Sequence, residues 1–357
     1  MSLVSHGMWS IHSLHEGALM KLVIQIPCFN ESETLAIALA ELPREVDGFD
    51  VVEWLIIDDG STDNTAEVAR ANGVDHVIRH PMNRGLAEAF MTGIDACLKV
   101  GADVIVNTDA DNQYNGADIP ALTKPILTGE AEIVIGARPI SETEHFSRLK
   151  KVLQRLGSWV VRVASHTDVA DAPSGFRAFT REAAMRLNVF NAYTYTLEMI
   201  IQAGQSNMQV ISVPIRTNAD LRPSRLVRSI GNYVQRSLGT IVRVFVIYRP
   251  LALFLWTGIP CIAFGLLYGV RFLVLYLTGR GEGHIQSVVL VALCLILGTL
   301  LIMMGLIADL IAANRKISER ILLHVQRIEL EIDSRRVDDT AGARGRSAMP
   351  SSKPPSQ

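Results

Sequence analysis

The sequence is poor in cysteine, and neither sign of charge is in excess. Four cysteines are scattered over 357 residues, at positions 28, 97, 261 and 294. This spacing is typical of neither a disulfide framework nor a zinc site, and it fits a reducing compartment for the soluble part of the chain. The 34 Lys and Arg residues are matched by 36 Asp and Glu residues. Without a basic surplus there is no long-range attraction for polyanions, so we expect no nucleic-acid partner.

Two further absences concern the ends of the first domain. Residues 1–20 contain no basic segment followed by an apolar core, so we expect an N-terminal extension and no signal peptide. Between Leu221 and Gly281 there is no Asp or Glu, while arginines recur among apolar residues at helical spacing. This pattern predicts a basic amphipathic juxtamembrane region over 222–250 on an anionic membrane face, with an ordinary surface helix as the alternative.

Two apolar runs account for much of the hydrophobic fraction of 49%. They cover residues 251–277 and 285–308, and each exceeds the roughly 20 residues that a helix needs to cross a bilayer core. We therefore predict a transmembrane hairpin over 251–312. Basic residues flank the pair on both outer sides, whereas the hinge holds only Arg280. The positive-inside rule then predicts a multi-pass protein of the inner (cytoplasmic) membrane, with the preceding domain and both termini in the cytoplasm.

The segment after the hairpin has an apolar stripe. Five β-branched residues recur every three or four positions in 313–337, at Ile317, Ile321, Val325, Ile328 and Ile332. The stripe fits either a short coiled coil between subunits or a single helix on the head domain. The polar, Pro- and Ser-rich residues 338–357 are expected to be a disordered tail.

Residues 21–221 alternate between short apolar runs and segments with helical spacing. The expected strands are KLVIQIP, VVEWLIIDDG, HVIRH, ADVIVNTDAD and AEIVIGAR. Strand–helix alternation of this kind predicts an α/β fold with a doubly wound, mostly parallel sheet. Ligands of such sheets bind beyond the carboxyl ends of the strands, so polar residues at those ends should converge on one cleft.

The segment NTDADNQY, residues 107–114, places Asp109 and Asp111 after a buried strand. Two carboxylates this close repel each other unless a positive group lies between them. Hard divalent cations take oxygen ligands and share them with substrate phosphates. Asp109, Asp111 and Gln113 are therefore candidate ligands for Mg²⁺ or Mn²⁺. Taken alone, the motif also fits a strand-end turn with solvated carboxylates.

Six short motifs occur in a fixed order along this domain. They are IPCFNE (26–31), DDGSTDNT (58–65), NRG (83–85), DADNQ (109–113), GAR (136–138) and DAPSGFR (171–177). Together with the C-terminal membrane hairpin, the set resembles family 2 glycosyltransferases of the A-type nucleotide-sugar fold. Within them it is similar to the polyprenol-phosphate glycosyltransferases related to dolichol-phosphate mannose synthase. The resemblance covers roughly residues 21–313 and implies a catalytic glycosyltransferase domain over 21–221.

The resemblance also implies a role for each matching residue. Nucleotide-sugar binding is implied for Pro27, Asn30, Glu31, Asp58, Asp59, Asn83, Gly85 and Asp109. The metal and diphosphate site is implied at Asp109, Asp111 and Gln113, and the catalytic set at Asp109, Asp111, Arg138 and Arg177. Contact with the acceptor phosphate is implied for Arg177, Ser174, Asp171, Arg148 and Lys151, although the basic residues of 148–155 cannot be matched singly.

The activity implied is an inverting transfer of one sugar from a nucleoside-diphosphate sugar to a membrane polyprenyl phosphate. UDP-glucose and GDP-mannose are the leading donors. A phosphate monoester is largely dianionic at neutral pH, so the acceptor needs no strong general base. The implied partners are a flippase, a downstream glycosyltransferase and further copies of the chain in a homo-oligomer.

Two other functions stay open. A processive polysaccharide synthase is disfavoured because the sequence lacks a QxxRW motif and a multi-helix pore. A membrane scaffold with an inactive transferase domain is disfavoured because Asp58, Asp109, Asp111 and Arg177 are all intact.

Overall fold

A computed structural model describes most of the chain, namely residues 19–139, 162, 165, 167–187, 189, 195–218, 243, 246, 248–279 and 285–347. Arg148, Lys151 and the greater part of the expected juxtamembrane region lie outside the described residues. The chain forms two compact units. The first comprises 1–144, 167–223 and 319–357, and the second comprises 145–166 and 224–318.

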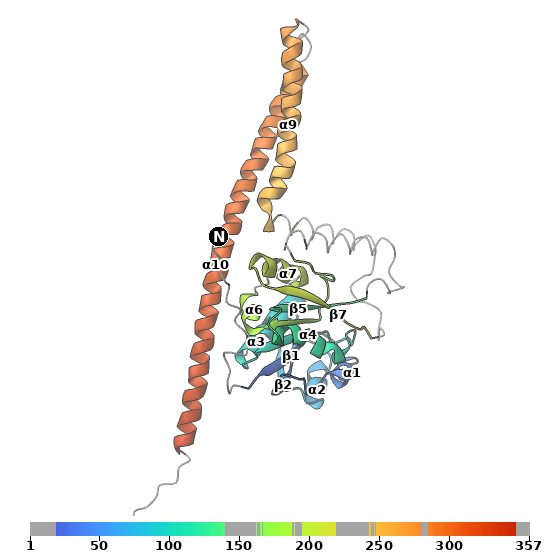
Figure 1. Ribbon diagram of the computed structural model, residues 1–357, viewed down its shortest axis with the longest axis vertical. Coiled ribbons are helices and arrows are strands. Elements are labelled where there is room, and N and C mark those ends of the chain that lie inside the picture. The colour runs from blue at the N-terminus through green and yellow to red at the C-terminus, as the bar shows by residue number, and fades with distance from the viewer. Residues whose placement is uncertain are drawn as a thin grey trace, which may run out of the picture. The chain divides into compact units, whose positions relative to one another are not determined.

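The first unit is built on a seven-stranded sheet of order β3-β2-β1-β4-β6-β5-β7 (Figure 1). Every neighbouring pair is parallel except for β6, which runs antiparallel to both β4 and β5. The prediction of a doubly wound, mostly parallel sheet is confirmed. The strands are β1 (Lys21–Cys28), β2 (Val51–Asp58), β3 (His76–Arg79), β4 (Val104–Asn107), β5 (Ile133–Ala137), β6 (Arg177–Thr180) and β7 (Val210–Pro214).

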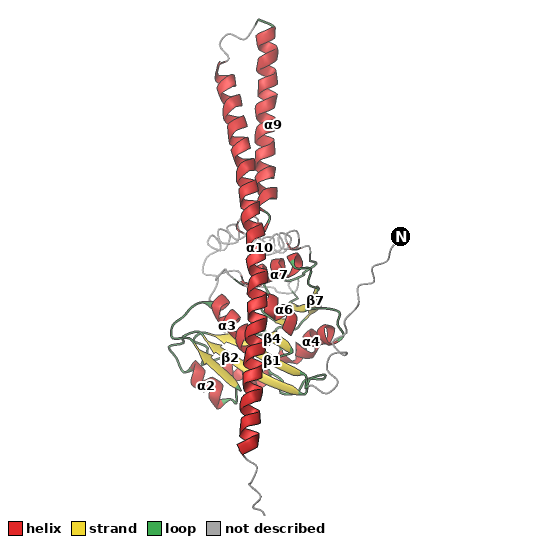
Figure 2. Cartoon of the chain, turned by 90° about the vertical axis from the view of Figure 1, so that its left-hand side faces the viewer, coloured by secondary structure: helices red, strands yellow, loops and turns green. Residues whose placement is uncertain are grey.

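Helices cover both faces of this sheet (Figure 2). On one face α1 (Leu35–Glu41), α2 (Thr65–Ala71) and α4 (Ile119–Leu127) contribute to a core cluster with alternate residues of β1, such as Ile24. On the other face lie α3 (Leu86–Lys99), α6 (Arg181–Arg186) and α7 (Tyr195–Gln205), where Phe90 packs against Phe179 and Tyr195. A short 3-10 turn, η2 (Gly116–Asp118), precedes α4. The two faces of β1 are both buried, which explains its nearly continuous apolar sequence.

A buried polar pair joins the two central strands. Gln25 of β1 donates from Nε2 to Oδ1 of Asn107 on β4 at 3.0 Å, and Asn107 donates from Nδ2 to the carbonyl of Gly175 at 2.8 Å. Both side chains are inaccessible to solvent. Buried amides need such partners, because an unpaired one costs about 1–3 kcal/mol. The pair therefore anchors the segment before β6 at the end of β4.

The second unit contains two helices long and apolar enough to cross a membrane. They are α9 (Pro250–Leu277) and the first part of α10 (Ile285–Ser347), with mean hydropathies of 1.9 and 2.8 over their most apolar windows. Only 11% of each window is buried, unlike the core helix of a soluble protein. We therefore interpret the two helices as a membrane hairpin, and its lipid-facing side chains need no protein partner.

Small residues allow the two helices of the hairpin to approach closely along the length of α9 (Figure 1). A Cβ on Gly298 would collide with Ile262 and lie 3.0 Å from the carbonyl oxygen of Gly258. A Cβ on Gly265 would lie 2.9 Å from Cys294, and one on Gly305 would lie 2.8 Å from Phe254. Close backbone approach of this kind is how helices associate in lipid, where apolar burial gives no advantage over contact with lipid tails.

Helix α10 continues to Ser347 without interruption. Ten of the residues in the expected disordered tail, 338–347, are therefore helical, and 348–357 lie outside the described residues. The physical reason is the absence of a strong helix breaker: no proline occurs between Pro260 and Pro350. Polar composition alone does not end a helix.

Candidate active site

The carboxyl ends of the strands bring the expected site residues together within the first unit. Asn30 and Glu31 follow β1, Asp58 and Asp59 end β2, and the segment 109–113 follows β4. Arg138 follows β5, and the segment 171–176 leads into the antiparallel strand β6. These residues form two neighbouring groups, one around the ends of β1 and β2 and one around the ends of β4 and β5.

In the first group, the turns after β1 and β2 are tied together. Asn30 adopts a left-handed backbone with φ of 54°, a conformation that Asn tolerates better than most residues. Its main-chain N–H donates to Oγ of Ser61 at 2.9 Å, and its side-chain oxygen accepts from the N–H of Thr62 at 2.9 Å. The N–H of Glu31 donates to Oγ1 of Thr65 at 3.0 Å. Asn30 and Glu31 therefore shape the rim of the site through these two turns.

Asp59 binds the segment that contains the NRG motif. One carboxylate oxygen accepts from the N–H of Arg84 at 2.9 Å, and the other accepts from the N–H of Gly85 at 2.8 Å. His80 lies 2.8 Å from Asp59 through Nδ1 and 3.0 Å from the hydroxyl of Thr92 on α3 through Nε2. Asp59 is 3% exposed, and these contacts let its carboxylate position the 80–85 segment.

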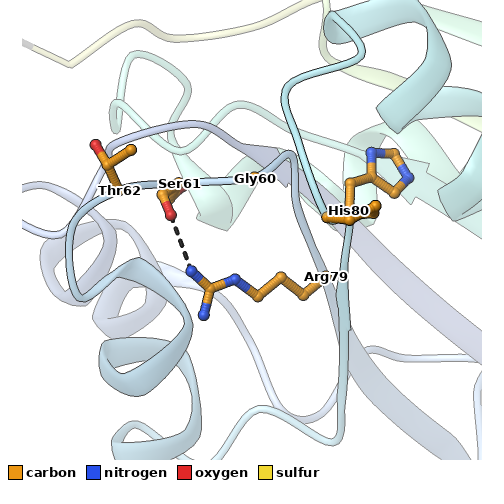
Figure 3. A pocket seen from close by; sticks show the side chains of 6 residues that line it. Gly60, Ser61, Thr62, Arg79 and His80 are labelled. Atoms are coloured by element: carbon orange, nitrogen blue, oxygen red, sulfur yellow. Dashed lines mark hydrogen bonds between the residues drawn. The ribbon is translucent and has the colours of Figure 1, made fainter.

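Asp58, in contrast, has an oxygen without a hydrogen bond. Oδ1 accepts from the N–H of Ser61 at 2.8 Å, whereas buried Oδ2 has no hydrogen-bond partner among the described residues. Nε of Arg79 lies 3.2 Å from Oδ2 and neutralises the carboxylate electrostatically. Arg79 and Ser61 line a hollow with Gly60, Thr62, His80 and Pro81, and Arg79 donates across it to the carbonyl of Ser61 (Figure 3).

Gly60 is the residue that makes this hollow possible. It has φ of +71°, and a Cβ there would collide with the backbone of Met82. The turn after β2 and the segment after β3 can approach this closely only with glycine at position 60. Asn83 is exposed and Gly85 has φ of +95°, so the NRG segment turns at the mouth of the same region.

The second group contains the two carboxylates of the DAD sequence. Burial and the charge of Asp111 raise the pKa of Asp109 to about 7, although Arg138 and Arg177 oppose the shift. Asp111 accepts from the N–H of Gln113 at 3.1 Å, and the intervening Asn112 has φ of 57°. The two carboxylates therefore interact electrostatically, as the sequence predicted, and a cation between them would relieve the repulsion.

Arg138 forms a paired interaction beside these carboxylates. Its Nε and Nη2 donate to the two oxygens of buried Asp171 at 2.7 and 3.1 Å, while Nη1 lies 3.5 Å from the side-chain oxygen of Gln113. Burial alone would lower the pKa of Arg138, but Asp171 raises it above its usual value. The paired contact fixes the plane of the guanidinium, and its side chain is still 21% exposed. It can therefore meet an anion at the edge of the site.

Arg177 lies underneath the site. It is 1% exposed and donates to three main-chain carbonyls, those of Ser174 at 2.7 Å, Ala172 at 2.7 Å and Thr196 at 2.9 Å. Burial lowers the pKa of Arg177 to about 10. Arg177 therefore supports the 171–176 segment from within. Contact with an acceptor phosphate, which the resemblance implies, would require this network to open.

Ser174 and Asp171 are also inaccessible to solvent. The N–H of Ser174 donates to the carbonyl of Asp171 at 3.2 Å, and the neighbouring Gly175 donates to the hydroxyl of Tyr114 at 2.9 Å. A Cβ on Gly175 would lie 2.9 Å from a carboxylate oxygen of Asp109. The segment thus packs directly against Asp109 and sets its position.

The donor atoms at this site suit a hard divalent cation. The candidate ligands are two carboxylates and one amide oxygen, and all three side chains are partly accessible. No group of three or more His, Cys, Asp or Glu side chains in the described part of the chain could hold a metal. Asp109 and Asp111 supply only two protein carboxylates, a set that fits a cation shared with substrate phosphates better than one enclosed by protein.

Four residues of the site were not identified from the sequence. Arg79 ends the short strand β3, His80 follows it, and Asn107 and Tyr114 flank the DAD sequence. Arg79 and His80 carried a usable signal, because they end a parallel strand beside Asp58. Asn107 and Tyr114 had no recognisable signal in the sequence, because the role of a buried amide or phenol is apparent only once its hydrogen-bond partner is known.

A doubly wound, mostly parallel sheet with a carboxylate pair at its carboxyl edge and Arg138 beside it is typical of transferases of the A-type fold. The comparisons with known proteins agree with this class. Residues 23–187 match the family described as Glycosyl transferase family 2. An uncharacterised protein of Methanocaldococcus jannaschii is 31% identical over 204 residues, which cover 55% of this chain and 81% of that protein. The chain belongs to glycosyl transferase family 2.

Two other comparisons extend this result. The undecaprenyl-phosphate mannosyltransferase of Micrococcus luteus is 27% identical over 206 residues, which cover 55% of this chain and 83% of that protein. Among solved structures, glucosyl-3-phosphoglycerate synthase of Mycobacterium tuberculosis in complex with phosphoglyceric acid has a TM-score of 0.51 and 22% identity. That likeness covers 63% of this chain and 79% of that one, and it supports the fold alone.

Proposed function

We propose that this protein transfers a single sugar, with inversion, from a nucleoside-diphosphate sugar to a polyprenyl phosphate in the membrane. The observation that carries the proposal is a combination: a family 2 active site in the same chain as two helices able to span a bilayer. Similarity to an undecaprenyl-phosphate mannosyltransferase supports the acceptor class. UDP-glucose and GDP-mannose are the donors to test first.

The group around β1 and β2 is proposed to hold the nucleoside. Asp58 Oδ2 is the acceptor that an N–H of the base can use, because it is buried beside Arg79 without a hydrogen bond. Asp59 and His80 fix the NRG segment that closes the same region. Asn30 and Glu31 shape the opposite rim through Ser61 and Thr65.

The group around β4 and β5 is proposed to hold the diphosphate and the acceptor phosphate. Asp109, Asp111 and Gln113 would hold Mg²⁺ or Mn²⁺, which neutralises the diphosphate leaving group when bound. Arg138 is proposed to offset the charge of the phosphates, because its orientation is fixed by Asp171 and one of its nitrogens faces Gln113. Asp171, Ser174 and Arg177 keep the wall behind Asp109 in place.

The membrane helices are proposed to hold the active site close to the membrane. A polyprenyl phosphate carries its phosphate at the headgroup level, and the hairpin of α9 and α10 is proposed to keep the active site there. A cytoplasmic active site in the inner membrane is the expected topology, by the positive-inside rule. A flippase and a downstream glycosyltransferase would then use the product.

The test is transfer of radiolabel from a panel of UDP- and GDP-sugars into undecaprenyl phosphate by the full-length protein in detergent. Mg²⁺ and Mn²⁺ are compared with a chelator. Asp111→Asn removes one carboxylate of the proposed cation site at nearly constant volume. Asp47→Asn is the matched control, because Asp47 is an exposed carboxylate outside the site.

Label in the lipid fraction from one donor, lost with chelator and in Asp111→Asn but kept in Asp47→Asn, would support the proposal and name the sugar. Repeated addition of sugar to one lipid would instead indicate a processive synthase. Absence of transfer from every donor, with the protein folded, would contradict the proposed acceptor and favour an inactive scaffold.

A further inference from the structure

The part of α10 beyond the hairpin has two different faces. On one face Leu323, Gln326 and Leu330 are partly buried. Beside them Glu329 lies 3.9 Å from Lys99 of α3, and Arg327 pairs with Glu182 of α6. Residues 319–347 belong to the same compact unit as the sheet. This face is therefore the one by which the helix contacts the head domain.

The other face is apolar and uncovered. Ile321, Val325, Ile328 and Ile332 are 61%, 53%, 57% and 47% exposed. Leu322 and Ile317 extend the same stripe and are also exposed. A contiguous apolar stripe of this kind is unusual on a free surface and marks an interaction site. Because the head domain already contacts the opposite face, the head cannot be the partner of this stripe.

The spacing of the stripe identifies the shape of its partner. Ile321, Val325, Ile328 and Ile332 are separated by four, three and four residues. This alternation places Val325 and Ile332 at the a positions and Ile321 and Ile328 at the d positions of a heptad repeat, which matches another helix packed alongside.

The continuity of α10 identifies that helix as one from another copy of the chain. The helix runs unbroken from its apolar part at Ile285 through the stripe. Two copies anchored in the same bilayer therefore present their stripes in the same direction and at the same height. Confinement by the anchors also raises the effective concentration of one stripe near the other, which offsets the shortness of a seam of about two heptads. A parallel, in-register pairing follows.

We propose that this protein self-associates through the exposed stripe of α10, residues 317–332, as a parallel coiled coil of identical chains. This interface is independent of the transferase function proposed above. Loss of one by mutation leaves the other measurable.

The first test is disulfide cross-linking of the full-length protein in its membranes. Ile328→Cys places a thiol at a d position, where identical residues of parallel helices meet. Gln326→Cys places one on the face toward the head and is the control, together with the unmodified chain. We expect oxidation with copper phenanthroline to give a cross-linked dimer, reversible by reductant, with Ile328→Cys alone. Equal cross-linking of Gln326→Cys, or none with Ile328→Cys, would overturn the proposal.

The second test is the mass of the detergent-solubilised protein. Ile328→Glu puts a charge into the seam and should reduce the mass to that of one chain. Ile37→Glu is the matched control, because Ile37 is 45% exposed on α1 and lies outside the stripe. An unchanged mass for Ile328→Glu, or a single-chain mass for the unmodified protein, would refute the proposal. The thermal transition of buried Trp54 shows whether each variant is folded.

Discussion

Replacement of Arg177 by Met should destabilise the head domain severely. The guanidinium is 1% exposed and donates to the carbonyls of Ala172, Ser174 and Thr196. Methionine fills part of the same volume but donates no hydrogen bond. Three carbonyls that now have a charged donor would lose it.

The size of the effect follows from the number of bonds lost. A buried acceptor left without its partner costs about 1–3 kcal/mol. Three such acceptors sum to about 3–9 kcal/mol, and relaxation or an entering water recovers part of that. Part of this loss of stability is offset, because the variant no longer has the desolvation cost of the buried guanidinium charge. We therefore expect a loss of about 3–5 kcal/mol, or a fall in Tm of about 10 °C for a domain of this size.

The assay is the thermal unfolding of the full-length protein in detergent, followed by tryptophan fluorescence and combined with transfer kinetics. Arg70→Met is the matched control, because Arg70 is 57% exposed and pairs with Glu67, which is 58% exposed. That control should lose no more than about 1 kcal/mol. If Arg177→Met kept its Tm within about 2 °C while its KM for the polyprenyl phosphate rose, the supporting role would be refuted. Arg177 would then contact the acceptor directly.

Three other changes test different parts of the molecule. Gly298→Val should weaken the hairpin, because its side chain would collide with Ile262; the separation of spin labels on the two helices would increase. Asp59→Asn should raise KM for the donor more than it lowers kcat, because it disturbs the 80–85 segment. Glu53→Gln should lower Tm at pH 7, and this deficit should shrink below about pH 4.

The pH dependence at Glu53 follows from the sign of its shift. Burial alone would raise the pKa of Glu53, but hydrogen bonds from Lys21 and His76 lower it below its usual 4.5. The stabilisation is present above the unfolded pKa and is lost as the pH falls through the folded one. A Tm deficit of Glu53→Gln that grew as the pH fell would contradict this reasoning.

For the Gly298→Val prediction on the hairpin, Gly269→Ala is the control, because its Cβ would meet Val291 at 3.4 Å, an ordinary contact.

Most of the strands and helices were predictable from the sequence because they depend on local patterns. Strands β1, β2 and β4 are apolar runs that end in turn residues, and the helices between them have regular apolar spacing. Strands β6 and β7 were not predicted. β6 has four residues and begins with Arg177, and a charged residue at the start of a short run argues against a buried strand. Only the carbonyls of the segments before it and at the start of α7 make that burial tolerable.

The location of the site was predictable from the sequence, but the role of each side chain in it was less so. The strand-end rule places the candidates that follow β1, β2, β4 and β5 near one edge, because it depends only on parallel topology. The rule does not say which side chains face the ligand. Asp171, Ser174 and Arg177 all lie in the expected motif, yet all three are buried, and Arg177 donates to the carbonyl of Ser174. Long-range partners such as Tyr114 decide this, and they are separated from the motif by many residues.

The two acids that end β2 show the same point most directly. Asp58 is the last residue of β2 and Asp59 follows it, and the two side chains have different contacts. Asp59 accepts from Arg84, Gly85 and His80 and has no oxygen without a partner. Asp58 keeps Oδ2 without a hydrogen bond, at a point where an N–H would satisfy it. These contacts give Asp59 the positioning of the 80–85 segment, and we propose that Asp58 recognises the ligand. Exchange of the two roles by mutation should fail, because the N–H groups of Arg84 and Gly85 donate to the side chain of Asp59.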